Sequence, residues 1–354
     1  MTPIDAVIEG STPTSEADRL LAIQEPEQLF TDPGTLASEF RALARRWHPD
    51  TQDEPRAVAV FAHLAELRDR GLRTWATGLW DAGDTLWFRE GTDVPQTLPV
   101  RSRRRFELGR EFVCSDCLAT WVDGPCEDFL RQADQMTRTC RFSNTRMQAA
   151  FEDALPRLRA AVSLPDGSHV LIQELAPDLI RLRDLLAWLR GPLDGRHTAW
   201  IVSGLLNLAC YLEHAELTHN DLSLDTCFVS PVRHFVALPG AWWFGAVEGS
   251  PLLGVPSRTL AQMPPWLAAS GHAHRVLDLE QIRAVARELL GDATGQRFPS
   301  VTPEAMATWS RLATSGSARE DYREWMQEVL PESYGARRFV ALEITPEQVY
   351  GGKA

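Results

Sequence analysis

The sequence predicts an α+β protein made of several units: a helical hairpin, then a small β-rich unit, then a larger helical unit. Three observations predict this fold class. Apolar residues recur at helical spacing on both sides of Pro49. Between residues 106 and 175 they fall into short strand-like runs separated by turn signals. From Leu182 onward the helical spacing returns.

The composition is that of a globular protein. The 354 residues, 44% of them hydrophobic and 24% charged, suffice for two or three folding units. The net charge of −12 gives no general attraction to nucleic acid or to anionic membranes. We find no signal-peptide pattern, and the longest apolar run, residues 201–212, is too short to span a bilayer. We therefore expect a cytoplasmic protein with reduced cysteines and neither a nucleic-acid nor a membrane partner.

The hairpin prediction depends on two apolar faces. The first helix begins at Asp32-Pro33, which is typical of an N-cap followed by the first helical residue. Its apolar stripe consists of Leu36, Phe40, Leu43 and Trp47. Pro49 ends this helix. A second helix is predicted over about residues 55–75, with an apolar face made of Ala57, Phe61 and Leu64. Two such helices joined by a short polar loop form an antiparallel hairpin.

The remaining boundaries follow from composition and turn signals. We expect a disordered start over residues 1–17, the hairpin unit over 18–77, a glycine- and proline-rich linker over 78–103, the β-rich unit over 104–177, the helical unit over 178–345 and a tail over 346–354. The linker ends in Arg101-Ser102-Arg103-Arg104-Arg105, a run that either is solvated or binds phosphate. In the β-rich unit, strands are predicted over 106–113 and 118–122, a helix over 144–159, and a β-hairpin around Pro165-Asp166-Gly167.

Residues 40–50, Phe-Arg-Ala-Leu-Ala-Arg-Arg-Trp-His-Pro-Asp, resemble the second helix and loop of the J-domain of the DnaJ family. The resemblance covers about residues 18–75. In that family the His-Pro-Asp tripeptide contacts a DnaK-type chaperone ATPase and couples ATP hydrolysis to substrate capture. The resemblance implies that His48, Pro49 and Asp50 make this contact, and that Arg41, Arg45 and Arg46 contribute to docking.

The chain departs from the DnaJ family in two respects. Arg68 stands where the family usually has an aromatic residue. The Gly/Phe-rich segment and the cysteine-repeat zinc region of long DnaJ proteins are missing, so the sequence does not identify the client protein. The alternative is an ordinary helical hairpin with a proline-containing loop.

Residues 218–229, Thr-His-Asn-Asp-Leu-Ser-Leu-Asp-Thr-Cys-Phe-Val, resemble the catalytic loop of protein-kinase-like folds. Other segments follow in the order of that family: two strands over 106–122, a helix over 144–159, a strand leading to a hinge over 170–175, Met263-Pro264-Pro265-Trp266, and a central helix over 276–290. The resemblance covers roughly residues 104–340 and implies a small β-rich lobe and a larger helical lobe.

The groups that an active kinase needs are largely missing. Phosphoryl transfer requires charge neutralisation and alignment of the nucleotide. Lys353 is the only lysine, Thr226 replaces the magnesium-binding asparagine, and residues 235–245 contain no carboxylate. Cys114-Ser115-Asp116-Cys117 stands in place of a glycine-rich loop. The resemblance therefore implies a pseudokinase without bound ATP or magnesium, in which Trp242, Trp243 and Phe244 fill or cover the cleft.

In this interpretation His219, Asp221 and Thr226 are vestiges of the catalytic loop with structural roles. The alternative is an atypical phosphotransferase or nucleotide-binding protein with Asp221 as base and Asp225 as a cation ligand. Cys114 and Cys117, with Cys126 and Cys140, either are buried thiols or hold zinc. The overall expectation is a co-chaperone whose pseudokinase body binds a client or partner. A non-enzymatic scaffold is the third possibility.

Overall fold

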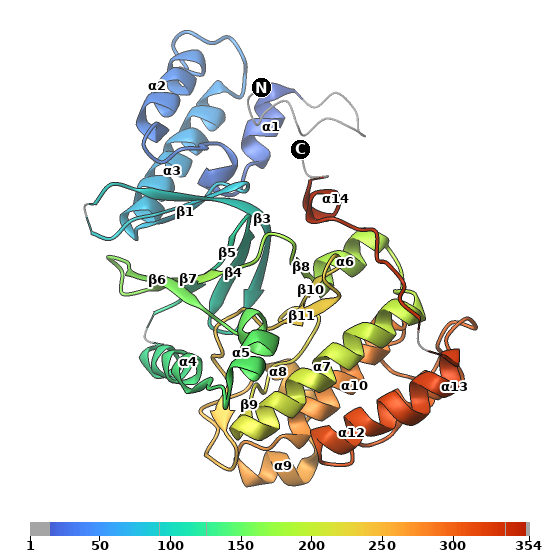
Figure 1. The fold of residues 1–354 in the computed structure, drawn as a ribbon. Coiled ribbons are helices and arrows are strands. Elements are labelled where there is room, and N and C mark those ends of the chain that lie inside the picture. The colour runs from blue at the N-terminus through green and yellow to red at the C-terminus, as the bar shows by residue number, and fades with distance from the viewer. Residues whose placement is uncertain (1–14, 92, 125, 337, 352–354) are drawn as a thin grey trace.

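The computed structural model describes residues 15–91, 93–124, 126–336 and 338–351. It is a mixed α+β structure with a helical unit at one end, a seven-stranded antiparallel sheet next to it, and a larger, mainly helical unit (Figure 1). The predicted α+β class is therefore confirmed. Within the described residues, no helix has both the length and the apolar character needed to cross a membrane.

The helical unit is built around a long hairpin. Its elements are α1 (Glu16–Ala22), the 3-10 turn η2 (Pro26–Gln28), α2 (Leu36–Arg46) and α3 (Ala57–Ala76). Helices α2 and α3 pack against each other, and α1 packs on α3. Phe40 and Leu64 are buried between them, as the apolar stripes predict, whereas Leu43 and Phe61 are half-buried. Asp32 does not cap α2 directly, because its carboxylate accepts a hydrogen bond from Gly34 in a preceding turn and Thr35 is the N-cap residue.

The sheet has the strand order β1-β2-β3-β4-β5-β7-β6, and all neighbours are antiparallel. Its strands are β1 (Leu79–Asp81), β2 (Thr85–Phe88), β3 (Gln96–Phe106), β4 (Gly109–Cys114), β5 (Cys117–Val122), β6 (Leu158–Ser163) and β7 (His169–Glu174). The predicted hairpin around Gly167 is present as β6 and β7, and Gly167 adopts the positive φ of 85° that favours glycine in a tight turn.

The prediction of a linker over 78–103 was wrong, because this segment forms β1, β2 and most of β3. The glycines that suggested a flexible tether lie in the turns of a meander, and Pro99 lies within β3, where it pairs with Thr85. Trp80, Leu86 and Phe88 are buried, so the segment carries its own apolar face. The arginines from 101 to 105 are likewise strand residues of β3 rather than a solvated linker.

Two further predictions in the β-rich unit were wrong. The run 106–113 is not one strand, because β3 ends at Phe106, which pairs with Gly109 at the start of β4 across a two-residue turn. The helix predicted over 144–159 is shorter. The chain forms α4 (Glu127–Thr139), α5 (Thr145–Phe151) and the 3-10 turn η3 (Glu152–Ala154), and Leu158 already belongs to β6. Asn144 caps α5 by accepting a hydrogen bond from the N–H of Met147 at 2.9 Å.

The large unit surrounds the buried helix α7. Its helices are α6 (Leu182–Leu189), α7 (Gly195–Ala215), α8 (Ser257–Gln262), α9 (Pro265–Ser270), α10 (Val276–Leu289), α11 (Glu304–Arg311), α12 (Ala318–Glu324), the π-helix η4 (Trp325–Val329), α13 (Leu330–Tyr334) and α14 (Pro346–Tyr350). Its short strands are β8 (Ile180–Arg181), β9 (Leu217–Thr218), β10 (Phe228–Ser230), β11 (Phe235–Ala237) and β12 (Ala246–Val247). Helices α10 and α12 pack on α7, and Leu205 and Leu206 belong to the largest apolar core of the described chain.

The two ends of the chain differ from the predictions. The predicted disordered start over 1–17 lies mostly outside the described residues, but Glu16 and Ala17 begin α1, and Ala17 is buried. The segment predicted as a tail over 346–354 begins with α14, in which Pro346 and Tyr350 are buried. Tyr350 packs into the main apolar core of the large unit, and this contact holds α14 in place.

Candidate functional site

The loop between α2 and α3 presents His48, Pro49 and Asp50 to solvent. The side chain of His48 is 44% exposed and that of Asp50 is 85% exposed. The backbone N–H of Asp50 donates a hydrogen bond to Nδ1 of His48 at 3.2 Å, and the carboxylate lies 3.7 Å from the same nitrogen. The ring of Phe61 lies edge-on to the imidazole, with 5.5 Å between the ring centroids. The loop therefore holds an imidazole and a carboxylate together at the tip of the hairpin.

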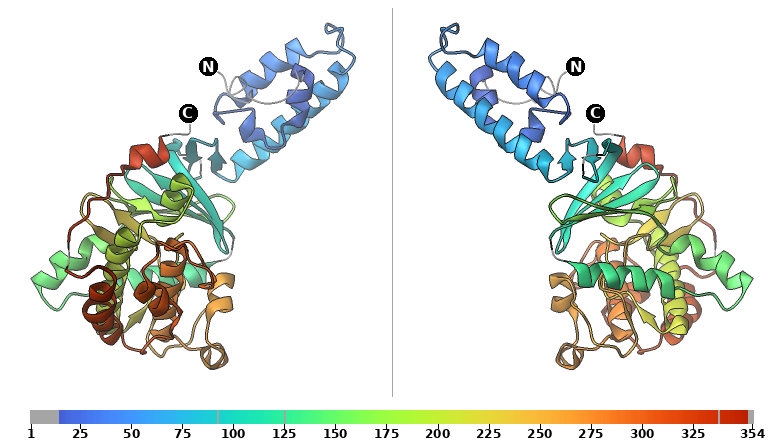
Figure 2. Two further views of the ribbon diagram at one scale, coloured as in Figure 1. Left: turned by 90° about the vertical axis from the view of Figure 1, so that its right-hand side faces the viewer. Right: turned by 90° about the vertical axis from the view of Figure 1, so that its left-hand side faces the viewer.

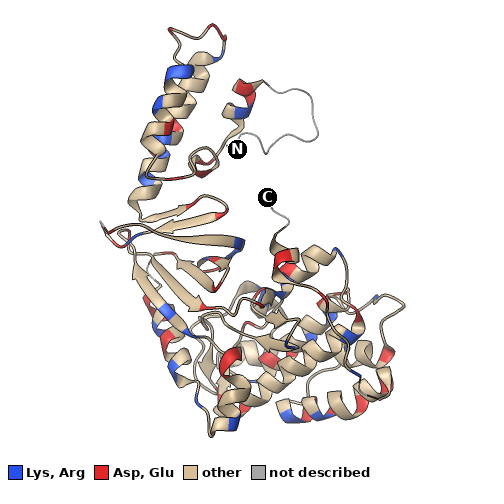
Figure 3. Cartoon of the chain, turned by 45° about the horizontal axis from the view of Figure 1, so that its top comes forward, with Lys and Arg blue, Asp and Glu red and all other residues tan. Residues whose placement is uncertain are grey.

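The three arginines of α2 lie on its exposed face, as predicted. Arg41, Arg45 and Arg46 are all exposed, whereas Leu36 and Phe40 of the same helix face the core. Arg46 pairs with Glu16 of α1 at 2.5 Å, and its side chain is still 60% exposed. Basic residues recur along the two hairpin helices (Figure 3). The face can attract an acidic surface although the whole chain is acidic.

Arg68 takes the place of the aromatic residue that the DnaJ resemblance leads one to expect. Its guanidinium group lies over the ring of Phe40, 4.5 Å from the centroid, and it pairs with Asp69. The cation–π contact joins α3 to α2 at this point. The departure from the family pattern thus leaves no gap in the hairpin.

The second predicted site is the loop from Thr218 to Thr226, which is anchored by Asp278 of α10. The carboxylate of Asp278 accepts hydrogen bonds from the backbone N–H of His219 at 2.8 Å and from that of Asn220 at 2.7 Å. Burial raises the pKa of Asp278 to about 7, although the two N–H donors oppose that rise. Asn220 adopts a positive φ of 61°, and its side-chain amide donates to the backbone oxygen of Phe244 at 2.8 Å. The loop is therefore anchored by hydrogen bonds to α10 and to the backbone of Phe244.

Asp221 lies in this loop and is held by Arg258 of α8. The Arg258 Nε and Nη2 groups donate to the same Asp221 oxygen at 3.0 and 2.7 Å. Burial raises the pKa of Asp221 to about 6, while Arg258 and Arg104 oppose the rise. One oxygen of the carboxylate is therefore engaged by the guanidinium group of Arg258.

The other two residues of the predicted vestigial loop brace the backbone. Thr226 donates from its hydroxyl to the backbone oxygen of Asp221 at 2.5 Å and accepts from the N–H of Ser223 at 3.0 Å. His219 accepts a hydrogen bond at Nδ1 from the N–H of Asp221 at 3.2 Å. Burial, with Arg258 adding to the effect, lowers the pKa of His219 to about 3, so its imidazole is neutral at pH 7. A protonated ring has no lone pair to accept that bond.

Asp225, considered as a cation ligand, is paired with arginines instead. Arg183 donates to its two carboxylate oxygens at 3.2 and 3.3 Å, and Arg258 lies 3.6 Å away. Although burial opposes the change, these guanidinium groups lower the pKa of Asp225 below its usual value. Its negative charge is thus already neutralised within the chain.

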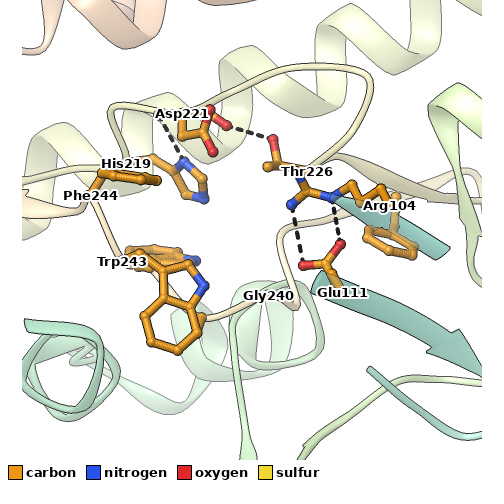
Figure 4. Close-up of a pocket in the computed structure, with 11 residues that line it drawn as sticks. Arg104, Glu111, His219, Asp221, Thr226, Gly240, Trp243 and Phe244 are labelled. Carbon is orange, nitrogen blue, oxygen red and sulfur yellow. Dashed lines mark hydrogen bonds and ion pairs between the residues drawn. The ribbon is translucent and has the colours of Figure 1, made fainter. Parts of the chain in front are cut away.

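The space next to this loop is almost filled. Trp242, Trp243 and Phe244 are 1%, 4% and 5% exposed. They and the loop leave a cavity of about 10 Å³, close to the space needed for one water molecule. Figure 4 shows His219 and Asp221 on one side of this cavity, Trp243 below it, and Arg104 with Glu111 opposite. The aromatic side chains therefore occupy most of the space beside the loop.

Buried charges of Arg104 and Glu111 line the opposite side of the same cavity. Glu111 of β4, only 3% exposed, pairs with Arg104 of β3 at 2.8 Å and with Arg181 of β8 at 3.1 Å. Burial raises the pKa of this carboxyl group, but the two guanidinium groups outweigh burial and hold it below its usual value. Sequence reasoning missed this cluster, because its three members are 7 to 77 positions apart and belong to different strands.

The β3–β4 turn is hydrogen-bonded to the start of α8 in the large unit. Glu107, in the β3–β4 turn, accepts hydrogen bonds from the N–H and the hydroxyl of Ser257 at 3.0 and 2.9 Å. Within the large unit, the backbone N–H of Arg181 in β8 donates to the hydroxyl of Tyr350 in α14 at 3.0 Å. These contacts tie the sheet to α8 and β8 to α14.

The cysteines do not form a common site. Cys114 and Cys117 are buried thiols in β4 and β5. Cys126 and Cys140 flank α4 at opposite ends, which separates them by about 20 Å at 1.5 Å per residue. Within the described ranges, no group of three or more His, Cys, Asp or Glu side chains has the geometry to hold a metal ion.

The chain matches no protein-family model and no curated protein.

Proposed function

We propose that this protein is a J-domain co-chaperone: the helical unit recruits and stimulates a DnaK-type chaperone ATPase, and the kinase-like remainder is a catalytically inactive adaptor for a client or partner protein. The single observation that carries the proposal is the geometry of the hairpin tip. His48 and Asp50 are exposed and hydrogen-bonded to each other at the end of the α2–α3 hairpin, beside the exposed arginines of α2.

The shape of the helical unit supports this assignment. A J-domain is implied by the resemblance over about residues 18–75, and a hairpin of α2 and α3 with α1 packed across it occupies that range. Arg41 and Arg45 face solvent on the helix that leads into the loop. An acidic surface on the chaperone would be attracted to this helix and then meet the His-Pro-Asp loop.

Two features of the remainder support a pseudokinase. A β-rich unit, a helical stretch, a hairpin and a larger helical unit follow in the order that the kinase-like resemblance implies. The cavity of about 10 Å³ next to Asp221 disfavours the alternative of an atypical phosphotransferase, because phosphoryl transfer needs an aligned nucleotide with its metal. Asp221 is paired with Arg258, and the space that it borders is this small cavity.

Measuring the ATP turnover of a purified DnaK-type chaperone with and without this protein tests the proposal. We expect the full chain to raise turnover and His48→Gln to remove the rise. His272→Gln, which changes an exposed histidine in the large unit, is the matched control and keeps the rise. Equal stimulation by the wild type and by His48→Gln, or no stimulation by either, would overturn the proposal.

A further inference from the structure

The connection between the helical unit and the sheet is a packed turn. Helix α3 ends at Ala76, and β1 begins at Leu79. Gly78 between them has a φ of 92°, a conformation that residues with a side chain rarely adopt. A Cβ atom at this position would lie 2.6 Å from Pro165 and 2.9 Å from the backbone oxygen of Arg89. The chain therefore passes from one unit to the other through a close-packed point.

Strand β1 contributes to the cores of both units at once. Successive side chains of a strand point to opposite faces. Trp80 is fully buried in the core of the helical unit, and its neighbour Leu79 is buried in the core of the sheet. A Cβ atom at Gly71 of α3 would lie 3.3 Å from the Trp80 ring, so the helix and the indole are in close contact. Any rotation of the helical unit relative to the sheet would have to break one of these cores.

Arg89, which follows β2, forms a second connection. Its backbone N–H donates to the oxygen of Gly78 at 2.9 Å. Its guanidinium group lies over the ring of Trp75, 4.5 Å from the centroid, and donates to the backbone oxygen of Trp75 at 3.4 Å. The last turn of α3 is thus held by β1 on one side and by the end of β2 on the other.

The hairpin tip lies at the opposite end of α3. This helix has 20 residues, which corresponds to about 30 Å. Both views of Figure 2 show the hairpin extending away from the rest of the chain, with the α2–α3 loop at its far end. The packing of Trp80 against α3 therefore determines the direction in which the α2–α3 loop points.

We propose that the helical unit and the sheet form one rigid body, with Trp80 and Arg89 as positioning residues, so that a chaperone docked at residues 48–50 is held at a fixed distance and direction from the kinase-like body. The functional part rests on the proposed co-chaperone activity. A protein bound to the body would then be presented to the chaperone in one orientation, which a J-domain on a flexible tether does not provide.

Distance measurements by double electron–electron resonance test the rigidity without any chaperone. Spin labels are introduced with unnatural amino acids at Ser38 in α2 and Ala269 in α9, both exposed, which avoids the six native cysteines. We expect one narrow distance distribution for the wild type. Inserting six Gly and Ser residues after Thr77, together with Arg89→Ala, is expected to broaden it. The same six residues inserted after Gly91, whose surroundings are open, should leave it narrow.

Trp80→Ala is the second variant, with helix content followed by circular dichroism. Wild-type helix content with a broadened distribution supports the positioning role of Trp80. A broad distribution in the wild type, or one equally narrow in the Thr77 insertion variant, overturns the rigid-body proposal.

Chaperone ATP turnover is measured separately with the insertion variant, and we expect this variant to stimulate it as the wild type does. If the wild type does not stimulate the chaperone, the proposed function is overturned. The distance distributions still show whether the two units form a rigid body.

Discussion

The guanidinium group of Arg258 donates two hydrogen bonds to one carboxylate oxygen of Asp221. The carboxylate is 9% exposed, so it depends on this partner and not on water. A side chain that would serve as base in an active kinase thus stabilises the junction between its loop and α8.

Arg258→Ala is expected to lower the free energy of unfolding by about 2 kcal/mol at pH 8, because a buried carboxylate loses both donors. Urea denaturation gives this value. Arg138→Ala is the matched control, since Arg138 pairs with Asp134 of the same helix and is 78% exposed, and the expected loss is below about 0.5 kcal/mol. Equal stability of the two variants would show that the Asp221 pairing contributes nothing.

His219 makes the fold sensitive to acid. The folded-state pKa of His219 is lowered to about 3 from 6.5, so between these values the unfolded chain binds a proton that the folded chain does not. The contribution of His219 to the free energy of unfolding is therefore fully present above pH 6.5. It decreases as the pH falls, by about 1.4 kcal/mol per pH unit.

Replacing the imidazole with a group that does not titrate tests this dependence. His219→Gln is expected to unfold with a shallower pH dependence between pH 6 and pH 4, measured by urea denaturation at several pH values. His272→Gln, at an exposed position, should keep the wild-type dependence. Identical slopes for wild type and His219→Gln contradict the prediction.

ATP with magnesium is expected to leave the melting temperature unchanged at millimolar concentration. Trp243 and Phe244 line the cavity of about 10 Å³ beside Asp221, which is far smaller than a nucleotide. A ligand raises the melting temperature only if it binds the folded protein. Differential scanning fluorimetry measures the shift. A saturable increase in melting temperature would favour the nucleotide-binding alternative.

Arg68→Ala is expected to destabilise the protein by about 1 kcal/mol, because the cation–π contact with Phe40 is lost from the α2–α3 interface. Chemical denaturation followed by helix circular dichroism detects the change. Arg73→Ala, an exposed position on the same helix, is the control and should lie within about 0.5 kcal/mol of the wild type. If both variants behave alike, Arg68 does not replace the missing aromatic residue.

Helical periodicity predicted the long elements well. Helices α3 and α10 differ from their predicted bounds by one or two residues, because each has a continuous apolar face and a clear start or end signal. The β1–β3 meander was missed for the opposite reason. Its first two strands have only three and four residues, and its glycines mark turns as readily as they mark a linker.

The site was predictable only where it is local in sequence. The tripeptide at 48–50 and the arginines of α2 lie within ten residues, so one amphipathic helix places them together. The position of α14 depends on contacts such as Tyr350 with Arg181, 169 positions apart. Nothing in the local pattern around residue 350 distinguishes a docked helix from a tail.

The most direct test of the co-chaperone assignment is ATP hydrolysis by a DnaK-type chaperone in a single turnover, with two variants of the same loop. Asp50 and Asp53 are both exposed and both would become asparagine, so the charge change is the same. We predict that Asp50→Asn lowers hydrolysis to the unstimulated rate, while Asp53→Asn accelerates it as the wild type does. Acceleration by Asp50→Asn equal to that of Asp53→Asn would contradict the account.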